Sequence, residues 1–227
     1  MSLDDKVNDK QSEGFMKKAL KLGWKIGMAA ATTALSTSYV GITGVAVGGA
    51  LAAAESIGNL IKGKSLYETV SEALTAYSAV NSVIAPIVSL GDATFHLIDN
   101  STLLGKAART IYATTAYNAA FVASYNAAAH LIDNPLNPQG MAKSISGNFY
   151  NQWKRVGLGF LPGYALVANE VPLFGGISHF AWNALPWGIY NKVNPLPDPK
   201  NIEYPQKQMP SITPQKQVPA MTPAPAT

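Results

Sequence analysis

Residues 26–54 read IGMAAATTALSTSYVGITGVAVGGALAAA, a run of 29 positions without a charged side chain. A helix needs about 20 predominantly apolar residues to cross the hydrocarbon core of a bilayer. The run is long enough for this, so we predict that it forms the first span of a membrane bundle. The alternative is a buried helix of a soluble, alanine-rich bundle.

Small residues recur at every fourth position of this run, at Gly44, Gly48 and Ala52. Such a ridge lets a second helix approach closely, which matters where lipid removes the hydrophobic drive for helices to associate. We therefore predict a helix-packing site at these three residues, formed within the chain or with a neighbouring subunit.

The composition also favours burial in a membrane or in a large assembly. Of the 227 residues, 48% are hydrophobic and 13% are charged, and that charged share is about half the share usual in soluble domains. The net charge of +4 fits a weak attraction to anionic lipid or nucleic acid and does not decide between them. The absence of cysteine excludes disulfides, thiolate zinc sites and cysteine nucleophiles.

The N-terminal region, residues 1–25, starts with a polar stretch and continues as a basic amphipathic helix. Apolar side chains fill one half of the helical wheel from residue 15 onward, and lysines share the other half. A helix of this kind lies on an anionic membrane surface with its tryptophan at the headgroup level. The alternative is an ordinary helix with a solvated, lysine-rich face. The predicted membrane-surface residues are Lys17, Lys18, Lys21, Trp24 and Lys25.

Two further helices are expected over residues 71–98, with Pro86 as a kink, and over residues 107–132. Their polar residues suit a membrane only where they meet protein or water. We therefore expect these helices to pack against each other or to line a wet interior.

The motif HLIDN closes both helices, at residues 96–100 and 130–134, and indicates an internal repeat. One interpretation is a pair of metal or proton sites, because each motif places a histidine and an aspartate three residues apart. The alternative is helix capping, since a histidine in the last turn and an asparagine just beyond it both suit a helix C-terminus. The candidate polar or ion-site residues are His96, Asp99, His130 and Asp133.

The C-terminal part of the chain consists of three segments that differ in composition. Residues 141–155 predict a second interfacial amphipathic helix, and residues 156–190 an apolar segment broken by prolines and glycines. That segment also holds Glu170, a further candidate for the polar site. Residues 191–227 contain the repeated motifs PQKQMP and PQKQVP, and predict a disordered, Pro-rich tail that acts as a spacer or binds a partner protein.

The predicted fold class is all-α: a multi-pass transmembrane helical bundle of about four spans, the fourth broken, over residues 26–190. The distribution of lysine and arginine favours both termini on the cytoplasmic or equivalent interior side. We find no phosphate-binding loop, dinucleotide fingerprint, HExxH or GxSxG motif. We therefore expect a non-enzymatic membrane protein without cofactor or resident metal.

Two functions of different class remain open at this point. The first is a structural subunit of a larger assembly, such as a membrane complex or the membrane layer of a virus, with the lipid bilayer and other subunits, including copies of itself, as partners. The second is a pore, transporter or membrane-penetrating delivery protein, in which the second and third helices line a polar interior. The sequence does not indicate nucleic acid as a partner.

Overall fold

The computed structural model describes residues 3–147, 149–159, 161–169 and 189, and all regular structure in these ranges is helical. The predicted all-α fold class is therefore confirmed for this part of the chain. The tail at residues 191–227 lies outside it. In chain order the helices are α1 (Leu3–Val40), α2 (Ile42–Ile61), α3 (Leu66–Phe95), α4 (Leu103–Tyr112), α5 (Asn118–Asp133), α6 (Met141–Ser146), α7 (Phe149–Gly159) and α8 (Leu161–Ala168).

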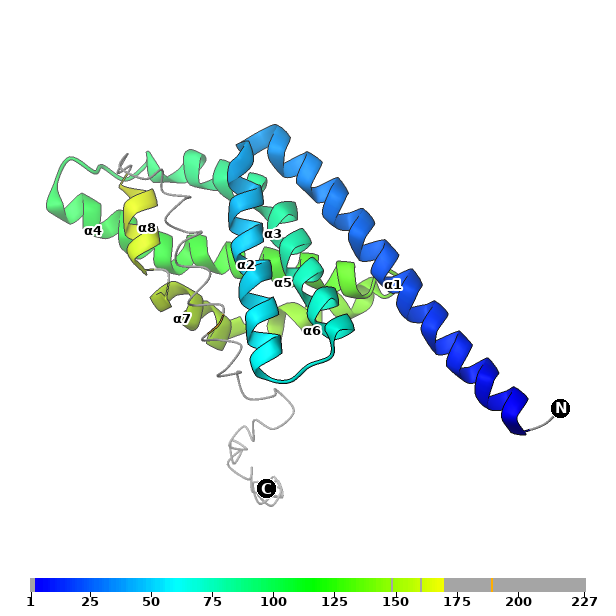
Figure 1. Ribbon diagram of the computed structural model, residues 1–227. Helices are drawn as coiled ribbons and strands as arrows, with labels where there is room; N and C mark the ends of the chain where they lie inside the picture. The colour runs from blue at the N-terminus through cyan, green and yellow to red at the C-terminus, as the bar shows by residue number, and fades with distance from the viewer. Residues whose placement is uncertain (1–2, 148, 160, 170–188, 190–227) are drawn as a thin grey trace, which may run out of the picture. The chain divides into compact units, whose positions relative to one another are not determined.

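The uncharged run 26–54 does not form one helix, so the prediction of a single first span over it is wrong. α1 ends at Val40, and α2 begins at Ile42 after a sharp corner (Figure 1). Gly41 between them has a φ of 61°, a conformation that glycine reaches without steric cost. Its N–H still bonds to the carbonyl oxygen of Thr37 at 3.1 Å, so α1 completes its last turn before the chain changes direction.

α3 is the central helix, because α1, α2 and α5 all pack against it (Figure 1). Its start is fixed by a capping box, in which Ser65 Oγ accepts from the Glu68 N–H and the Glu68 carboxylate accepts from the Ser65 N–H. These reciprocal bonds satisfy two donors that a helix start leaves unpaired. The second helix predicted over 71–98 is confirmed with an earlier start, and Pro86 lies inside it.

Two apolar clusters hold the helices around α3. In the first, Val47 of α2 packs with Val80 and Ile84 of α3. The second includes Phe95 at the end of α3 and Tyr117, whose ring centroids are 5.1 Å apart. The first cluster joins α2 to α3, and the second joins the end of α3 to the segment that contains Tyr117.

The third helix predicted over 107–132 is present as α4, a π-helical segment at Ala113–Tyr117, and α5. We call these three consecutive segments the α4–α5 rod, and this rod runs antiparallel to α3. Thr75 in the first half of α3 bonds to Asp133 at the end of α5, and Gly91 near the end of α3 lies against Tyr117. The sequence did not predict the π-helical segment.

The second interfacial helix, predicted over 141–155, is divided into α6 and α7, and α6 ends at Ser146. The prediction of one continuous helix there is wrong. Of the broken segment at 156–190, the structure describes only the first part, through α8.

Two described helices are long and apolar enough to cross a membrane, the Gly44–Ile61 part of α2 and the whole of α3. Within the protein, 33% of the α2 window and 56% of the α3 window are buried. The core helix of a soluble protein is mostly buried, so α2 leaves more of its apolar surface uncovered than such a helix does. The predicted third and fourth crossings stay predictions.

Candidate functional site

Gly44 and Gly48 lie where α2 meets α1 and α3. A Cβ atom on Gly44 would stand 1.6 Å from Ser36 Oγ and 3.0 Å from Asn81 Oδ1. A Cβ atom on Gly48 would stand 2.4 Å from Asn81 Nδ2. Only a hydrogen side chain permits so close an approach. Ala52, the third member of the ridge, is half-buried two turns further along α2 than Gly44. The glycine ridge thus faces helices of its own chain.

Polar side chains occupy the interior of the helix contacts. Between residues 14 and 40 of α1, the buried positions are Lys25, Thr32 and Ser36. Lys25 contacts Ser71 of α3, and Ser36 lies against Gly44 of α2. Soluble bundles bury mainly aliphatic residues at such positions. The buried polar and charged residues of the described ranges are Lys25, Thr32, Ser36, Asn59, Thr69, Ser71, Thr75, Ser78, Asn81, Arg109, Asn118 and Asn126.

Large apolar side chains lie on the outside of the same helices. On α1 they are found between Phe15, which is 76% exposed, and Tyr39, which is 71% exposed. Single exposed apolar residues are common in soluble proteins, but a continuous exposed set marks contact with a membrane or a partner. The exposed set on α1 and α2 is Phe15, Met16, Leu20, Trp24, Ile26, Leu35, Tyr39, Ile42, Ile57, Leu60 and Ile61.

The lysines of α1 differ in their surroundings. Lys17, Lys18 and Lys21 are exposed, and Lys18 Nζ lies 5.5 Å from the centre of the Tyr67 ring of α3. Their contact with a membrane surface stays a prediction. For Lys25 that prediction is wrong, because only 2% of its side chain is exposed. The sequence could not show this, since Lys25 follows the same helical spacing as the other lysines.

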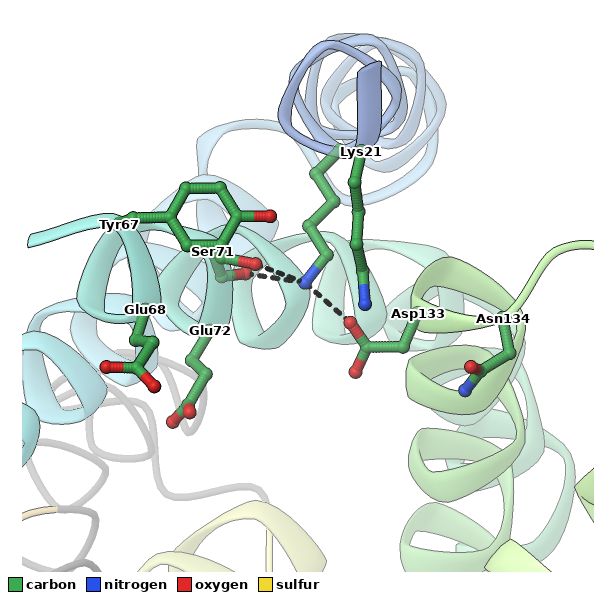
Figure 2. Close-up of a pocket in the computed structure, with 8 residues that line it drawn as sticks. Lys21, Tyr67, Glu68, Ser71, Glu72, Asp133 and Asn134 are labelled. Carbon is green, nitrogen blue, oxygen red and sulfur yellow. Dashed lines mark hydrogen bonds and ion pairs between the residues drawn. The ribbon is translucent and has the colours of Figure 1, made fainter. Parts of the chain in front are cut away.

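A polar cleft of about 380 Å³ lies between α1, α3 and the end of α5 (Figure 2). Its lining residues are Lys21, Lys25, Tyr67, Glu68, Ser71, Glu72, Asp133 and Asn134. Lys21 extends from α1 toward the cleft, and Tyr67 and Ser71 lie on α3 (Figure 2). The cleft is therefore formed by three segments that are distant in the sequence.

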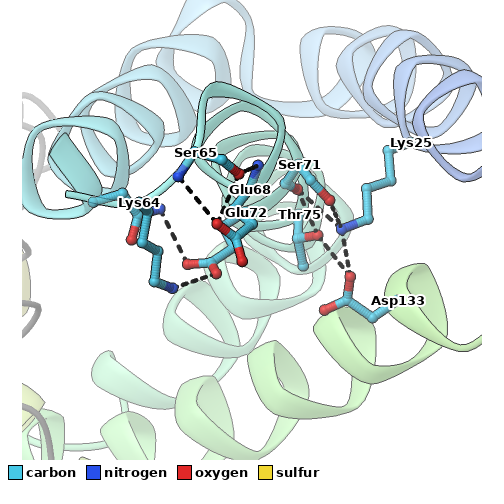
Figure 3. Close-up of polar contacts among 9 residues, drawn as sticks. Lys25, Lys64, Ser65, Glu68, Ser71, Glu72, Thr75 and Asp133 are labelled. Carbon is cyan, nitrogen blue, oxygen red and sulfur yellow. Dashed lines mark hydrogen bonds and ion pairs between the residues drawn. The ribbon is translucent and has the colours of Figure 1, made fainter. Parts of the chain in front are cut away.

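Lys25 is one of the residues that line this cleft, and its ammonium group joins three helices (Figure 3). Its Nζ donates to the carbonyl oxygen and the hydroxyl of Ser71 at 3.0 and 2.7 Å, and lies 2.5 Å from Asp133 Oδ1. Thr75 Oγ1 donates to the same Asp133 oxygen at 3.1 Å. Beside this network, Trp24 Nε1 donates to the Ile132 carbonyl oxygen at 3.0 Å. Trp24 and Lys25 thus attach α1 to the end of α5.

A second ionic contact lies at Glu72, the residue after Ser71 on α3. Lys64, in the loop after α2, lies 2.5 Å from Glu72 Oε1, and Asn59 Nδ2 donates to Glu72 Oε2 at 3.1 Å. The loop between α2 and α3 is thereby tied to the first turns of α3 (Figure 3).

The first HLIDN motif does not bring its histidine and aspartate together. His96 Nδ1 lies 2.9 Å from the Asp92 carbonyl oxygen. Asp99 accepts from the backbone N–H and the hydroxyl of Ser101, at 2.9 and 2.8 Å. These bonds stabilise the ionised carboxylate and hold the pKa of Asp99 below its ordinary value. The motif closes α3 and shapes the loop that follows it.

The second HLIDN motif also separates its two side chains. His130 Nε2 lies 2.8 Å from the Asn137 carbonyl oxygen, in the turn after α5, whereas Asp133 faces Lys25. The interpretation of the repeat as two His–Asp pairs is therefore wrong. Among the residues that the structure describes, no group of three or more His, Asp or Glu side chains is placed to hold a metal. Glu170 lies outside those residues.

The largest polar network that the sequence did not predict surrounds Asn118, at the junction of the π-helical segment and α5. Asn118 Nδ2 donates to the Trp153 carbonyl oxygen at 2.7 Å, and Asn118 Oδ1 accepts from Tyr164 OH at 2.9 Å. Trp153 Nε1 donates to the carbonyl oxygen of Thr115 at 2.8 Å. The wider π turn offers such carbonyl groups to neighbouring side chains. These bonds attach α7 and α8 to the long rod.

Arg109 of α4 was also missed as a structural residue. Its side chain is buried, and it donates to the Ile98 carbonyl oxygen at 2.5 Å and to the Ala168 carbonyl oxygen at 3.1 Å. It thus connects the loop after α3 with the end of α8. An arginine inside an otherwise weakly charged helix was the available sequence signal.

Comparison of the chain with protein-family models, with curated proteins and with solved structures finds no match.

Proposed function

We propose that this protein is an integral membrane protein that acts as a structural subunit of a larger membrane-associated assembly. The observation that carries the proposal is the arrangement of polarity in α1, α2 and α3. Their contacts enclose serine, threonine, asparagine and one lysine beside valine, isoleucine and alanine, while leucine, isoleucine and aromatic side chains also face outward. This arrangement lowers the cost of burying polar groups in lipid and leaves an apolar exterior for lipid or for neighbouring subunits.

The distribution of positive charge supports an orientation. The Lys25–Asp133 contact and the Lys64–Glu72 contact lie at the same end of α3, since Ser71 and Glu72 are consecutive residues. Positive charge in short loops and near span ends favours the interior side of a membrane. We therefore place the N-terminus and the loop between α2 and α3 on the interior side. The side of the C-terminus stays a prediction from the sequence.

Extraction tests the proposal directly. Membranes that contain the full chain are washed with high-pH carbonate and then dissolved in mild detergent, and the size of the released particle is measured. We expect the protein to resist carbonate and to leave the membrane in a particle larger than one chain plus its micelle. Release by carbonate alone would contradict membrane integration, and a single-chain particle would contradict the assembly role.

A pore or transporter is the second candidate, and one observation favours it. Four buried oxygens in α1 and α3 have no hydrogen-bond partner among the residues that the structure describes: Ser36 Oγ, Thr69 Oγ1, Ser78 Oγ and Asn81 Oδ1. Buried polar atoms of this kind are usually hydrogen-bonded to water. Water molecules between these helices would be expected in a water-filled pore. Liposomes carrying the purified protein distinguish the candidates, because a pore releases an entrapped dye or ion and a structural subunit does not.

A further inference from the structure

The charges that line the cleft between α1 and α3 are mostly neutralised within the protein. Lys25 is paired with Asp133, and Glu72 is paired with Lys64 from the loop after α2. These four side chains bring equal positive and negative charge to the region. They leave little net field for a ligand, so the remaining charges of the lining decide what it attracts.

Two charges of opposite sign remain, Lys21 on α1 and Glu68 on α3. Neither makes an ion pair with another residue of the described ranges. Glu68 accepts hydrogen bonds from the backbone N–H and the hydroxyl of Ser65, which keep it ionised and fix its position at the start of α3. The lining of the cleft therefore includes one positive group on α1 and one negative group on α3.

The cleft also lies at the level expected for lipid headgroups. It borders the first turns of α3, directly after the short loop at which the two candidate spans, Gly44–Ile61 and Leu66–Phe95, meet. The half-exposed Trp24 lies next to Lys25, as is common for aromatic residues at a membrane boundary. Leu20 and Leu66, exposed by 70% and 76%, provide apolar surface for acyl chains beside the polar groups.

We propose that this cleft binds the headgroup of a zwitterionic phospholipid with a primary ammonium group, with its phosphate at Lys21 and its ammonium at Glu68. The proposal rests on the proposed membrane location. The volume of the cleft, about 380 Å³, is at the lower end of the range of small-molecule sites and suits a headgroup. A primary ammonium donates N–H bonds to a carboxylate, and a quaternary choline group has no N–H to donate. The site therefore favours phosphatidylethanolamine over phosphatidylcholine, and over an anionic lipid that lacks the ammonium.

Lipid binding to the full chain tests this proposal. The protein, purified in detergent, is titrated with phosphatidylethanolamine, phosphatidylcholine or phosphatidylglycerol of identical acyl chains, and bound lipid is counted by native mass spectrometry. We expect the ethanolamine lipid to bind about tenfold more tightly than the other two, the effect of one charge-assisted hydrogen bond. Glu68→Gln should abolish this preference, whereas Lys21→Gln should weaken the binding of all three lipids, because each of them carries the phosphate.

Matched variants keep the test free of folding effects. Glutamine at position 68 can still serve the capping box with Ser65, so the start of α3 is preserved. Lys106→Gln removes an exposed lysine of α4, outside the cleft, and should leave the preference unchanged. Equal binding of the three lipids, tighter binding of phosphatidylglycerol, a preference that survives Glu68→Gln, or lipid binding that Lys21→Gln does not weaken would overturn the headgroup site.

The two proposals fail in different ways. A protein that resists carbonate but shows no preference for the ethanolamine lipid loses only the headgroup site. A protein that carbonate releases loses the membrane role, whatever lipid it binds in detergent.

Discussion

The contacts of α2 with α1 and α3 differ in kind from the contacts of the α4–α5 rod with α7 and α8. In the first region, the absence of side chains at Gly44 and Gly48 lets the helices approach, and neighbouring oxygens such as Ser36 Oγ have no partner. In the second region, Asn118 connects three segments through its amide, and both ends of the amide are hydrogen-bonded.

The difference shows two ways of joining helices whose interiors are polar. Close packing stabilises a helix contact through many small dispersion interactions, and an added atom destabilises the contact because it forces the helices apart. A satisfied amide network gains directed bonds and fails when a partner is removed, because the remaining groups are then buried without hydrogen bonds. The first region should therefore be sensitive to added volume and the second to lost polarity.

The largest effect is expected for Gly48→Leu. The new side chain would overlap Asn81 Nδ2 and approach the Tyr77 carbonyl oxygen of α3, so α2 must move away from α3. We expect a loss of about 3 kcal/mol in the free energy of unfolding, the upper part of the range for overpacked contacts. Thermal unfolding in detergent measures it. Gly49→Leu is the matched control, because no atom lies within 4 Å of a Cβ at that position. Equal destabilisation by both variants would contradict the close contact.

The second largest effect is expected for Asn118→Leu, which keeps the approximate volume and removes the amide. Tyr164 OH loses its acceptor and the Trp153 carbonyl oxygen loses a donor. We expect a loss of about 2 kcal/mol, since buried polar groups without partners cost about 1–3 kcal/mol. Thr115→Val should change little, because that exposed hydroxyl bonds only within its own helix. A stable Asn118→Leu protein with an unchanged melting temperature would show that the network does not hold α7 and α8.

Asp133→Asn tests a contact that belongs to neither region. The change leaves the Lys25 ammonium, 2% exposed, without its counter-charge, whereas the Asp133 side chain is 39% exposed and partly screened by solvent. We expect a loss of about 1–2 kcal/mol, below the range for fully buried pairs. Faster hydrogen exchange of α1 amides should accompany it. Lys25→Met should cost less, because the orphaned carboxylate can reach water. The reverse order of the two variants would argue against a buried ammonium.

The smallest effect is expected for Ser36→Ala, where the removed hydroxyl has no partner and adjoins Gly44. Stability should be unchanged or raised by less than about 1 kcal/mol, because an unsatisfied group is removed. Thr33→Val on the same helix provides the contrast, since the Thr33 hydroxyl lies 2.8 Å from Tyr77 OH, and its loss should cost about 1 kcal/mol. Clear destabilisation by Ser36→Ala would show that water or an ion satisfies this oxygen, as the pore hypothesis requires.

Much of the helical framework could be predicted from local sequence. The helices that became α3 and the α4–α5 rod were predicted from their uncharged runs and their turn residues, and Pro86 was placed inside α3. The candidate site was predicted only in parts. Lys25 and Asp133 were both singled out, but for separate roles, because a sequence pattern contains no information on which residues from distant segments meet.

By itself, the sequence determined the all-helical class, the low charge, and the small residues that permit close packing, because these depend on composition and on spacing within one helix. The tertiary structure decided three further features: the corner at Gly41, the burial of Lys25 against Asp133, and the π turn around which Asn118 makes its bonds. Hydropathy does not distinguish one long helix from two that meet at a glycine, since both contain the same uncharged residues. An ammonium and a carboxylate separated by more than a hundred positions form a pair only when packing on α3 brings their helices together.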